Sequence, residues 1–233
     1  VINEKIFITG VAGFLGSHVA DELSQREYRV TVFDCNVSPW ITEKQEMSVG
    51  SMLDSSRLAE VCEGARYLYH FGGIADIGEA KDKPLETIEV NIMGAARALE
   101  IARLANIERF LYASTMYVYS AAGSFYRASK QAAEIIIEAY AERYGLEYTF
   151  LRYGSLYGPR AQEWNGLRRY VKQIVQKDKL EYWGTGKELR EYIHVRDAAQ
   201  LSVNILDDIH KNSAITVTGH QVLNAEELID LIF

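Results

Sequence analysis

The sequence has little cysteine, little proline and no long run of apolar residues: two cysteines and three prolines occur among 233 residues. Cys35 and Cys62 offer no disulfide framework, and no His or Cys spacing suggests a metal pair, so we expect a reducing compartment and no metal. No apolar stretch approaches the ~20 residues of a membrane-spanning helix, and the first residues lack a signal-peptide pattern. We therefore expect a cytoplasmic protein that does not bind membranes.

Basic charge is also scarce. The 25 Lys and Arg residues against 32 Asp and Glu give a formal net charge of -7, and the basic residues form no block. Binding to nucleic acid or to an anionic membrane needs a concentrated basic surface, because it depends on neutralising phosphates. The charge therefore argues against both partners. The 48% of hydrophobic residues suffices for one large core and a small accessory lobe.

Short apolar stretches alternate with helical patterns along the first two thirds of the chain. We expect buried strands at residues 6–8, 29–34, 65–71, 108–114 and 147–152. We expect helices at residues 16–26, 85–105 and 126–144. Strands that alternate with helices of this length predict βαβ units and an α/β fold with a doubly wound parallel sheet, the Rossmann fold.

Three glycines, Gly10, Gly13 and Gly16, follow the first strand at intervals of three residues. A glycine pattern alone is a weak signal, but this one lies between a predicted strand and a predicted helix. There, glycines let the backbone approach a pyrophosphate, which the helix N-terminus stabilises. Asp34 ends the second strand, where its carboxylate can accept both adenosine ribose hydroxyls and would repel a 2′-phosphate, and no Arg sits beside it. The pattern predicts NAD rather than NADP.

Further residues are expected around this cofactor. Phe14 and Leu15 lead from the glycines into the helix, and Gly72 follows the third strand, where the cofactor phosphates would pass. Asp54 has two possible roles, which can coexist: it can cap the helix that follows it, or accept from the adenine amino group. His70 is expected to be a structural histidine at a strand end.

Tyr126 and Lys130 lie four residues apart at the start of a predicted helix, so they share one face. A tyrosine hydroxyl has an ordinary pKa of about 10, which makes it a poor base at neutral pH. A neighbouring ammonium and a positive nicotinamide ring favour the phenolate, and Lys130 can also bind the nicotinamide ribose. Thr115, at the carboxyl end of a strand, can hydrogen-bond the reacting oxygen. The three residues predict an acid–base site for hydride transfer.

The pattern changes after residues 158–160, where short elements replace the regular alternation. We assign residues 1–152 to an NAD-binding domain and residues 153–233 to a smaller substrate-binding lobe that is interleaved with it. The sequence stops within a helical pattern at residues 224–233, so we expect this lobe to be incomplete at its C-terminus.

Seven segments resemble, in order, the motifs of the NAD-dependent epimerase/dehydratase family of extended short-chain dehydrogenases/reductases. They cover nearly the whole chain: TGVAGFLGSH, HFGGIA, VNIMGA, ASTMYVY, YRASK, LRYGSLYGPR and REYIHVRD. The resemblance implies a nucleotide-sugar substrate and a catalytic trio of Thr115, Tyr126 and Lys130, with Ser114 as a secondary candidate. It also implies that Arg190 pairs with the substrate diphosphate, whose oxygens a guanidinium can bind in a bidentate manner.

The chain departs from the family pattern in two places. Ser155 stands where the family usually has an asparagine that contacts substrate or cofactor, so Ser155 is a candidate substrate residue with an altered contact. Only six residues separate Tyr119 from Tyr126, and these leave little to cover a substrate. Either the protein has no loop over the substrate here, or this sequence omits one.

The residues after Thr115 restrict the range of possible reactions. The family's dehydratases and decarboxylases carry an acid one or two positions after this threonine, where Met116 and Tyr117 cannot exchange protons as a carboxylate does. We therefore predict an NAD-dependent nucleotide-sugar epimerase, in which hydride goes to NAD and returns to the other face of the sugar. The alternative is a reductase or dehydrogenase of a sugar or other alcohol. A non-catalytic NAD-binding regulator would need neither Tyr126 nor Lys130.

Two helical segments suggest a homodimer. Residues 133–139 carry apolar side chains on more than one side, and residues 95–102 are rich in alanine. In the resembling family these two helices build a four-helix dimer interface, so the resemblance implies a homodimer.

Overall fold

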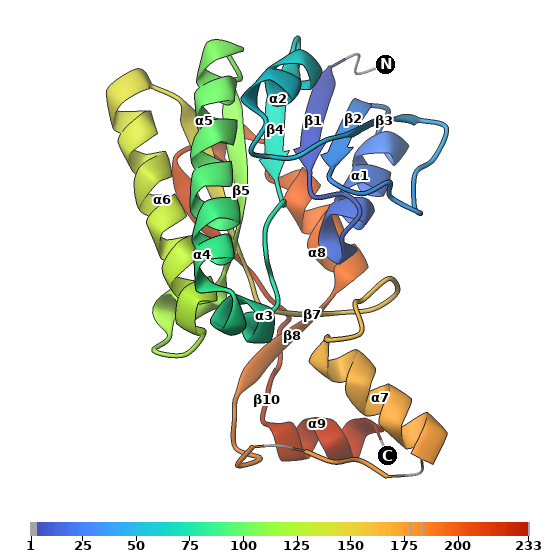
Figure 1. Ribbon diagram of the computed structural model, residues 1–233. Helices are drawn as coiled ribbons and strands as arrows, with labels where there is room; N and C mark the ends of the chain where they lie inside the picture. The colour runs from blue at the N-terminus through green and yellow to red at the C-terminus, as the bar shows by residue number, and fades with distance from the viewer. Residues whose placement is uncertain (1–3, 178, 183, 233) are drawn as a thin grey trace.

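The computed structural model describes residues 4–177, 179–182 and 184–232 (Figure 1). Its centre is a parallel sheet of seven strands in the order β3-β2-β1-β4-β5-β6-β9. These strands are β1 (Lys5–Thr9), β2 (Arg29–Asp34), β3 (Gln45–Val49), β4 (Tyr67–His70), β5 (Arg109–Thr115), β6 (Glu147–Tyr153) and β9 (Ser213–Val217). The strand order reverses between β1 and β4, which is where parallel α/β sheets bind ligands.

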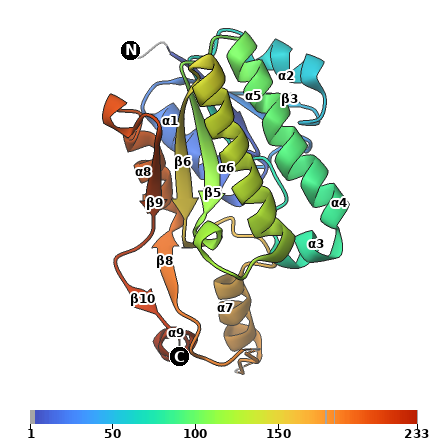
Figure 2. The ribbon, with the colours of Figure 1, turned by 90° about the vertical axis from the view of Figure 1, so that its left-hand side faces the viewer.

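Helices cover both faces of this sheet, as Figure 2 shows from the side. The helices α1 (Phe14–Gln25) and α8 (Val195–Asn204) pack on one face, and α2 (Ser55–Cys62), α5 (Gly94–Leu104) and α6 (Ser124–Tyr144) on the other. In β1, Ile6 and Ile8 join the first core and Phe7 joins the second, because side chains alternate along a strand. Burial on both faces explains the continuous apolar run, and the predicted doubly wound fold is confirmed.

The helix predicted at residues 85–105 is divided into three pieces. They are α4 (Pro84–Thr87), the π-helical segment η1 (Ile88–Met93) and α5. The buried Asn91 on η1 donates from Nδ2 to Ile74 O (3.0 Å) and accepts at Oδ1 from Ile74 N (2.7 Å). A π-helical turn therefore lies where this side chain fixes the segment after β4.

The chain after β6 builds a second, three-stranded sheet in the order β10-β8-β7 and also returns to the large one. Its strands are β7 (Ser155–Tyr157), β8 (Arg190–His194) and β10 (Val222–Leu223), with helices α7 (Gly166–Lys177) and α9 (Ala225–Ile232) beside them. The smaller elements are α3 (Ile77–Asp82), η2 (Met116–Tyr119) and η3 (Asp208–His210). Between β8 and β10 the chain returns to the large sheet, where α8 covers one face and β9 forms an edge strand (Figure 1).

Candidate functional site

The glycines after β1 form a cradle that side chains would fill. Gly10 has φ +81°, and a Cβ atom there would lie 2.5 Å from Gly72 N. A Cβ on Gly16 would collide with the carbonyl oxygen of Gly10. Gly13 is the N-cap of α1, so unpaired backbone N–H groups of the first helical turn lie beside this bare backbone. The cradle fits the pyrophosphate of a dinucleotide.

Asp34 lies at the end of β2, next to this cradle. Its Oδ2 accepts from the backbone N–H of Ala12 (2.9 Å), and its Oδ1 accepts from that of Asn36 (3.1 Å). The carboxylate thereby fixes the glycine loop and keeps lone pairs for ribose hydroxyls. Cys35 follows, and burial together with the Asp34 charge raises the pKa of its thiol. The surroundings of Asp34 suit an unphosphorylated ribose.

The segment after β3 borders the same site. Asp54 caps α2, because its Oδ1 accepts from the backbone N–H groups of Ser56 and Arg57, both at 3.1 Å. Met52 and its neighbours line the site, whereas Asp54 does not. The geometry gives Asp54 the capping role. Gly72 lies against the Met52 sulfur, which leaves no room there for a side chain.

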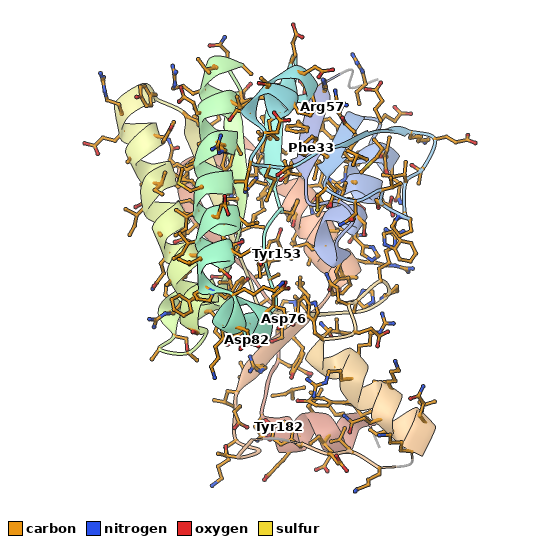
Figure 3. All side chains as sticks on the ribbon, viewed as in Figure 1. Phe33, Arg57, Asp76, Asp82, Tyr153 and Tyr182 are labelled. Atoms are coloured by element: carbon orange, nitrogen blue, oxygen red, sulfur yellow. The ribbon has the colours of Figure 1, made fainter. Side chains whose placement is uncertain are left out.

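A cleft of about 1100 Å³ runs from the glycine cradle to the small sheet. It follows the carboxyl ends of β1, β2, β5 and β6 and continues past β7 to β8 and the start of α7. In Figure 3 the labelled Asp76 and Tyr153, which both line the cleft, lie near the junction of the large sheet and the small lobe. The cofactor cradle and the small lobe thus share one cavity.

Thr115, Tyr126 and Lys130 meet in the middle of this cleft. Thr115 Oγ1 accepts from the backbone N–H of Tyr117 (3.2 Å), which leaves its own hydrogen for a ligand oxygen. The Lys130 ammonium donates to Ala113 O (2.7 Å) and lies 6.0 Å from the Tyr126 ring centroid. The structure therefore brings the three predicted catalytic residues together.

Burial shifts the pKa values of two of these groups in opposite directions. It raises the pKa of Tyr126 to about 12, which the Thr115 hydroxyl opposes in part. It lowers the pKa of Lys130 to about 8, and the charge of Glu134 opposes that shift. In both cases the desolvated site disfavours the charged form.

Ser114 has a different environment from Thr115. Its hydroxyl donates to Glu134 Oε1 (2.6 Å), and Glu134 pairs with Arg152 Nη2 at 2.6 Å and Nε at 3.0 Å. Arg152 in turn contacts the hydroxyl of Tyr119. Ser114 therefore belongs to a buried network that ties β5, α6 and β6 together behind Thr115. Sequence reasoning missed Glu134, although its position one turn after Lys130 was a signal.

The two predicted substrate residues lie on the small sheet. Arg190 is on β8 and donates from Nη1 to the hydroxyl of Tyr117 (2.7 Å), while Ser155 is on β7. Both line the cleft, at its end away from the glycines. Sequence reasoning did not foresee the contact with Tyr117, because it joins residues 73 positions apart.

Two buried polar side chains organise the site without lining it. Asn91 holds the segment after β4 and also donates to Ser129 Oγ on α6 (2.9 Å). His70 Nδ1 is 3.0 Å from Thr9 Oγ1, and its ring stacks on Tyr112. Burial lowers the pKa of His70 to about 3, so the imidazole is neutral. These contacts suit the structural role predicted for His70.

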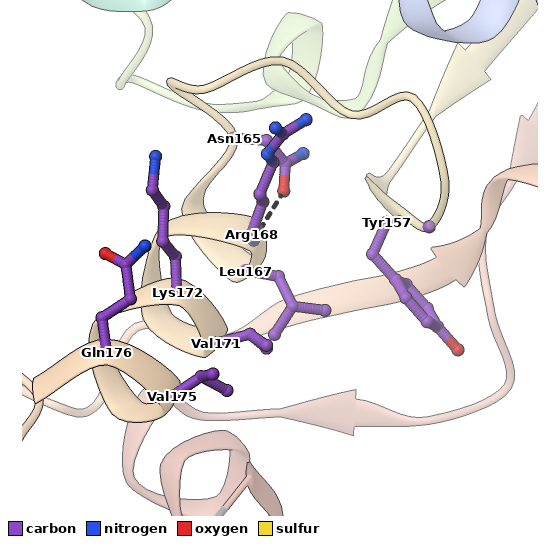
Figure 4. Close-up of a pocket in the computed structure, with 9 residues that line it drawn as sticks. Tyr157, Asn165, Leu167, Arg168, Val171, Lys172, Val175 and Gln176 are labelled. Atoms are coloured by element: carbon purple, nitrogen blue, oxygen red, sulfur yellow. Dashed lines mark hydrogen bonds between the residues drawn. The ribbon is translucent and has the colours of Figure 1, made fainter. Parts of the chain in front are cut away.

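A second pocket, of about 500 Å³, lies against α7 and is drawn in Figure 4. Leu167, Val171 and Val175 supply an apolar face opposite Tyr157. Asn165 caps α7, since its Oδ1 accepts from the backbone N–H of Arg168 (3.1 Å), the dashed line in the figure. Thr115, Tyr126 and Lys130 line the large cleft and not this pocket.

Comparison with known proteins identifies the family of this chain. The model of the NAD dependent epimerase/dehydratase family matches residues 6–218. The chain belongs to this family. A curated relative, the UDP-N-acetyl-α-D-glucosaminuronate decarboxylase of Bacillus cytotoxicus, is 28% identical over 97% of this chain and 78% of its own length. The UDP-glucose 4-epimerase of Rhizobium meliloti is 27% identical over 99% of this chain and 81% of its own.

A solved structure shares the fold of this chain. The UDP-glucose 4-epimerase of Thermotoga maritima, solved with UDP-glucose, superposes with a TM-score of 0.91 over 98% of this chain and 81% of its own. At 23% identity this likeness shows the fold. Family membership confirms two sequence predictions, that the protein is an enzyme and that its cofactor is NAD.

Within residues 4–177, 179–182 and 184–232, no helix is long and apolar enough to cross a membrane. In the same part of the chain, no group of three or more His, Cys, Asp or Glu side chains is arranged to hold a metal ion.

Proposed function

We propose that the protein is an NAD-dependent nucleotide-sugar epimerase. The observation that carries the proposal is the position of Thr115, Tyr126 and Lys130 in one cleft with the glycine cradle. The curated relatives include enzymes named for UDP-sugars, among them a UDP-glucose 4-epimerase. Met116 and Tyr117 follow Thr115, so no carboxylate is present there for dehydration or decarboxylation.

In this proposal the chain's own groups bind, orient and exchange protons. The glycine cradle and Asp34 bind the dinucleotide, and Lys130 binds its nicotinamide ribose. NAD supplies a reversible hydride acceptor next to the sugar carbon. Thr115 donates a hydrogen bond to the reacting oxygen, while the Tyr126 phenolate removes the hydroxyl proton and later returns it. Arg190 and Ser155 hold the rest of the substrate, so that the keto sugar can turn and expose its other face.

The decisive experiment is turnover with a panel of UDP-, GDP-, dTDP- and CDP-sugars, chosen first by thermal shift of the NAD-loaded protein. We expect one sugar to be converted to an epimer without accumulation of NADH, because an epimerase returns the hydride. Stoichiometric NADH formation would instead identify a dehydrogenase. Cofactor binding without conversion of any alcohol would identify a regulator.

We also propose a homodimer formed through α5 and α6. On α6, Ala133 and Ile137 are buried against the sheet, whereas Ile135 is 66% exposed. On α5, Leu104 is also exposed. An apolar residue that points away from the core on such a helix suits packing against a second copy.

A further inference from the structure

Tyr117 lines the cleft and contacts both Arg190 and Tyr126. Arg190 Nη1 donates to its hydroxyl (2.7 Å), and its ring meets the ring of Tyr126 edge to face, with centroids 6.3 Å apart at 78°. One side chain therefore contacts both the residue proposed for the diphosphate and the proposed base.

Local structure fixes the position of Tyr117. Its backbone N–H is held by Thr115 Oγ1, which caps the short helix η2. Gly123 has φ +100°, and a Cβ atom there would lie 3.1 Å from Tyr117 Cδ1. A side chain at this position would strain the backbone and crowd the aromatic ring. The glycine therefore helps to hold the segment between η2 and α6 against Tyr117.

The contact with Tyr117 prepares Arg190 for an anion. An unrestrained arginine loses side-chain entropy when it is fixed by a ligand. Tyr117 accepts from one N–H of the guanidinium, and the remaining donors stay available for phosphate oxygens. The Tyr117 oxygen accepts in this bond, so its own hydrogen remains available to a substrate oxygen. Restraining a binding group in advance lowers the entropy lost on binding.

We propose that Tyr117 is a positioning residue that couples the two ends of the substrate. Its hydroxyl holds Arg190 ready for the diphosphate, and its ring holds Tyr126 beside the sugar. The inference rests on the proposed function, from which the ligand of Arg190 and the role of Tyr126 are taken.

The first test uses UDP as the probe and measures its affinity for the NAD-loaded protein by calorimetry. Tyr117→Phe removes only the hydroxyl and is expected to weaken UDP binding ~3- to 10-fold, the range of one net hydrogen bond. In an Arg190→Met background the same change is expected to alter affinity less than ~2-fold, because coupled residues are not additive. Tyr140→Phe is the matched control, because that hydroxyl contacts Glu100 outside the cleft.

The second test separates the ring from the hydroxyl through kcat and KM for the sugar that the wild type converts. Tyr117→Phe is expected to raise KM with little change in kcat, whereas Tyr117→Leu, which lacks the ring, is expected to lower kcat as well. Unchanged UDP binding in Tyr117→Phe, or an equal loss with and without Arg190, overturns the inference and leaves the epimerase proposal intact. A wild type that binds NAD but no nucleoside diphosphate overturns both.

Discussion

At the residue scale, Tyr126 and Lys130 share one desolvated environment that disfavours the charge of each. The pKa of Tyr126 is about 12 and that of Lys130 about 8. The free protein therefore holds a neutral phenol beside an ammonium that keeps most of its charge at neutral pH. Two positive charges, that of Lys130 and that of the oxidised cofactor, together favour the phenolate. The Thr115 hydroxyl lies close enough to assist them.

Replacing the proposed base separates chemistry from binding. Tyr126→Phe should reduce the single-turnover rate ~100- to 10,000-fold, the range for a general acid–base group, with NAD affinity almost unchanged. Thr115→Ala should slow the reaction less, because it removes a substrate hydrogen bond and leaves the proton acceptor. Near-normal activity of Tyr126→Phe would show that the trio is assigned wrongly.

Removing the buried ammonium should stabilise the protein while it damages function. The pKa of Lys130 falls from 10.5 to about 8 on burial, which corresponds to about 3 kcal/mol of unfavourable charge burial, offset in part by its bond to Ala113 O. Lys130→Met should therefore raise the melting temperature of the cofactor-free protein by several degrees at neutral pH. The same variant should lose both activity and NAD affinity.

The stability difference between Lys130→Met and the wild type should depend on pH, because burial lowers the pKa of Lys130 in the folded protein. Between about pH 8 and 10.5 the unfolded wild type holds a proton on residue 130 that the folded protein has released. Wild-type stability therefore gains from this group as pH rises through that window, and the advantage of Lys130→Met disappears above it. Melting curves of both proteins at neutral and alkaline pH measure this difference. A difference in melting temperature that stays constant with pH would contradict the lowered pKa of Lys130.

Cofactor choice depends on a single carboxylate. Asp34 accepts from the glycine loop, and in the proposed cofactor site its carboxylate would bind the adenosine ribose and repel a 2′-phosphate. The wild type should therefore bind NAD more tightly than NADP. Asp34→Asn keeps the shape but removes the charge, and should weaken NAD binding about tenfold, as loss of charged hydrogen bonds does. The ratio of NAD affinity to NADP affinity should decrease at the same time. Calorimetric titration with both cofactors tests this, and tighter NADP binding by the wild type would refute it.

At the scale of elements, the network behind Thr115 joins β5, α6 and β6. Glu134 and Arg152 have side chains only 10% and 17% exposed, and Ser114 donates to the same carboxylate. The pair fixes α6, which carries Tyr126 and Lys130, relative to the strand that carries Thr115. Without its partner, either ion would be left charged in a largely buried position.

A double substitution tests whether the Glu134–Arg152 pair stabilises the protein by balancing its two buried charges. Glu134→Ala should destabilise the protein by about 3–5 kcal/mol, the cost of an unpaired buried ion. Adding Arg152→Met should recover most of that loss, because the guanidinium is no longer left without its carboxylate partner. Urea denaturation measures both, and equal stability of the single and double variants would exclude a charge penalty.

At the scale of the whole molecule, the exposed apolar side of α6 offers the surface for the proposed dimer. Ile135→Glu should convert the dimer to a monomer in light scattering at micromolar concentration, because it would bury an unpaired carboxylate at the interface. Leu201→Glu is the control, since Leu201 is 43% exposed on α8, on the opposite face of the sheet. A monomeric wild type would contradict the proposal.

Several parts of the protein can be predicted from the spacing of residues along the chain. The glycines between β1 and α1, the acid at the end of β2, and the trio within sixteen residues of β5 and α6 follow from local motifs. The five predicted strands all appear in the parallel sheet. Such features are readable because strand and helix periodicities place neighbouring residues relative to one another.

The folded structure reveals which distant side chains meet. It showed Arg190 bonded to Tyr117, Glu134 to Ser114, and the π-helical turn at Asn91. It also added the edge strand β3, whose partly exposed residues carry a weak apolar pattern, and returned β9 to the large sheet beside β6. These contacts depend on how separate elements pack and on where the chain crosses between layers, and neither is set by spacing along the sequence.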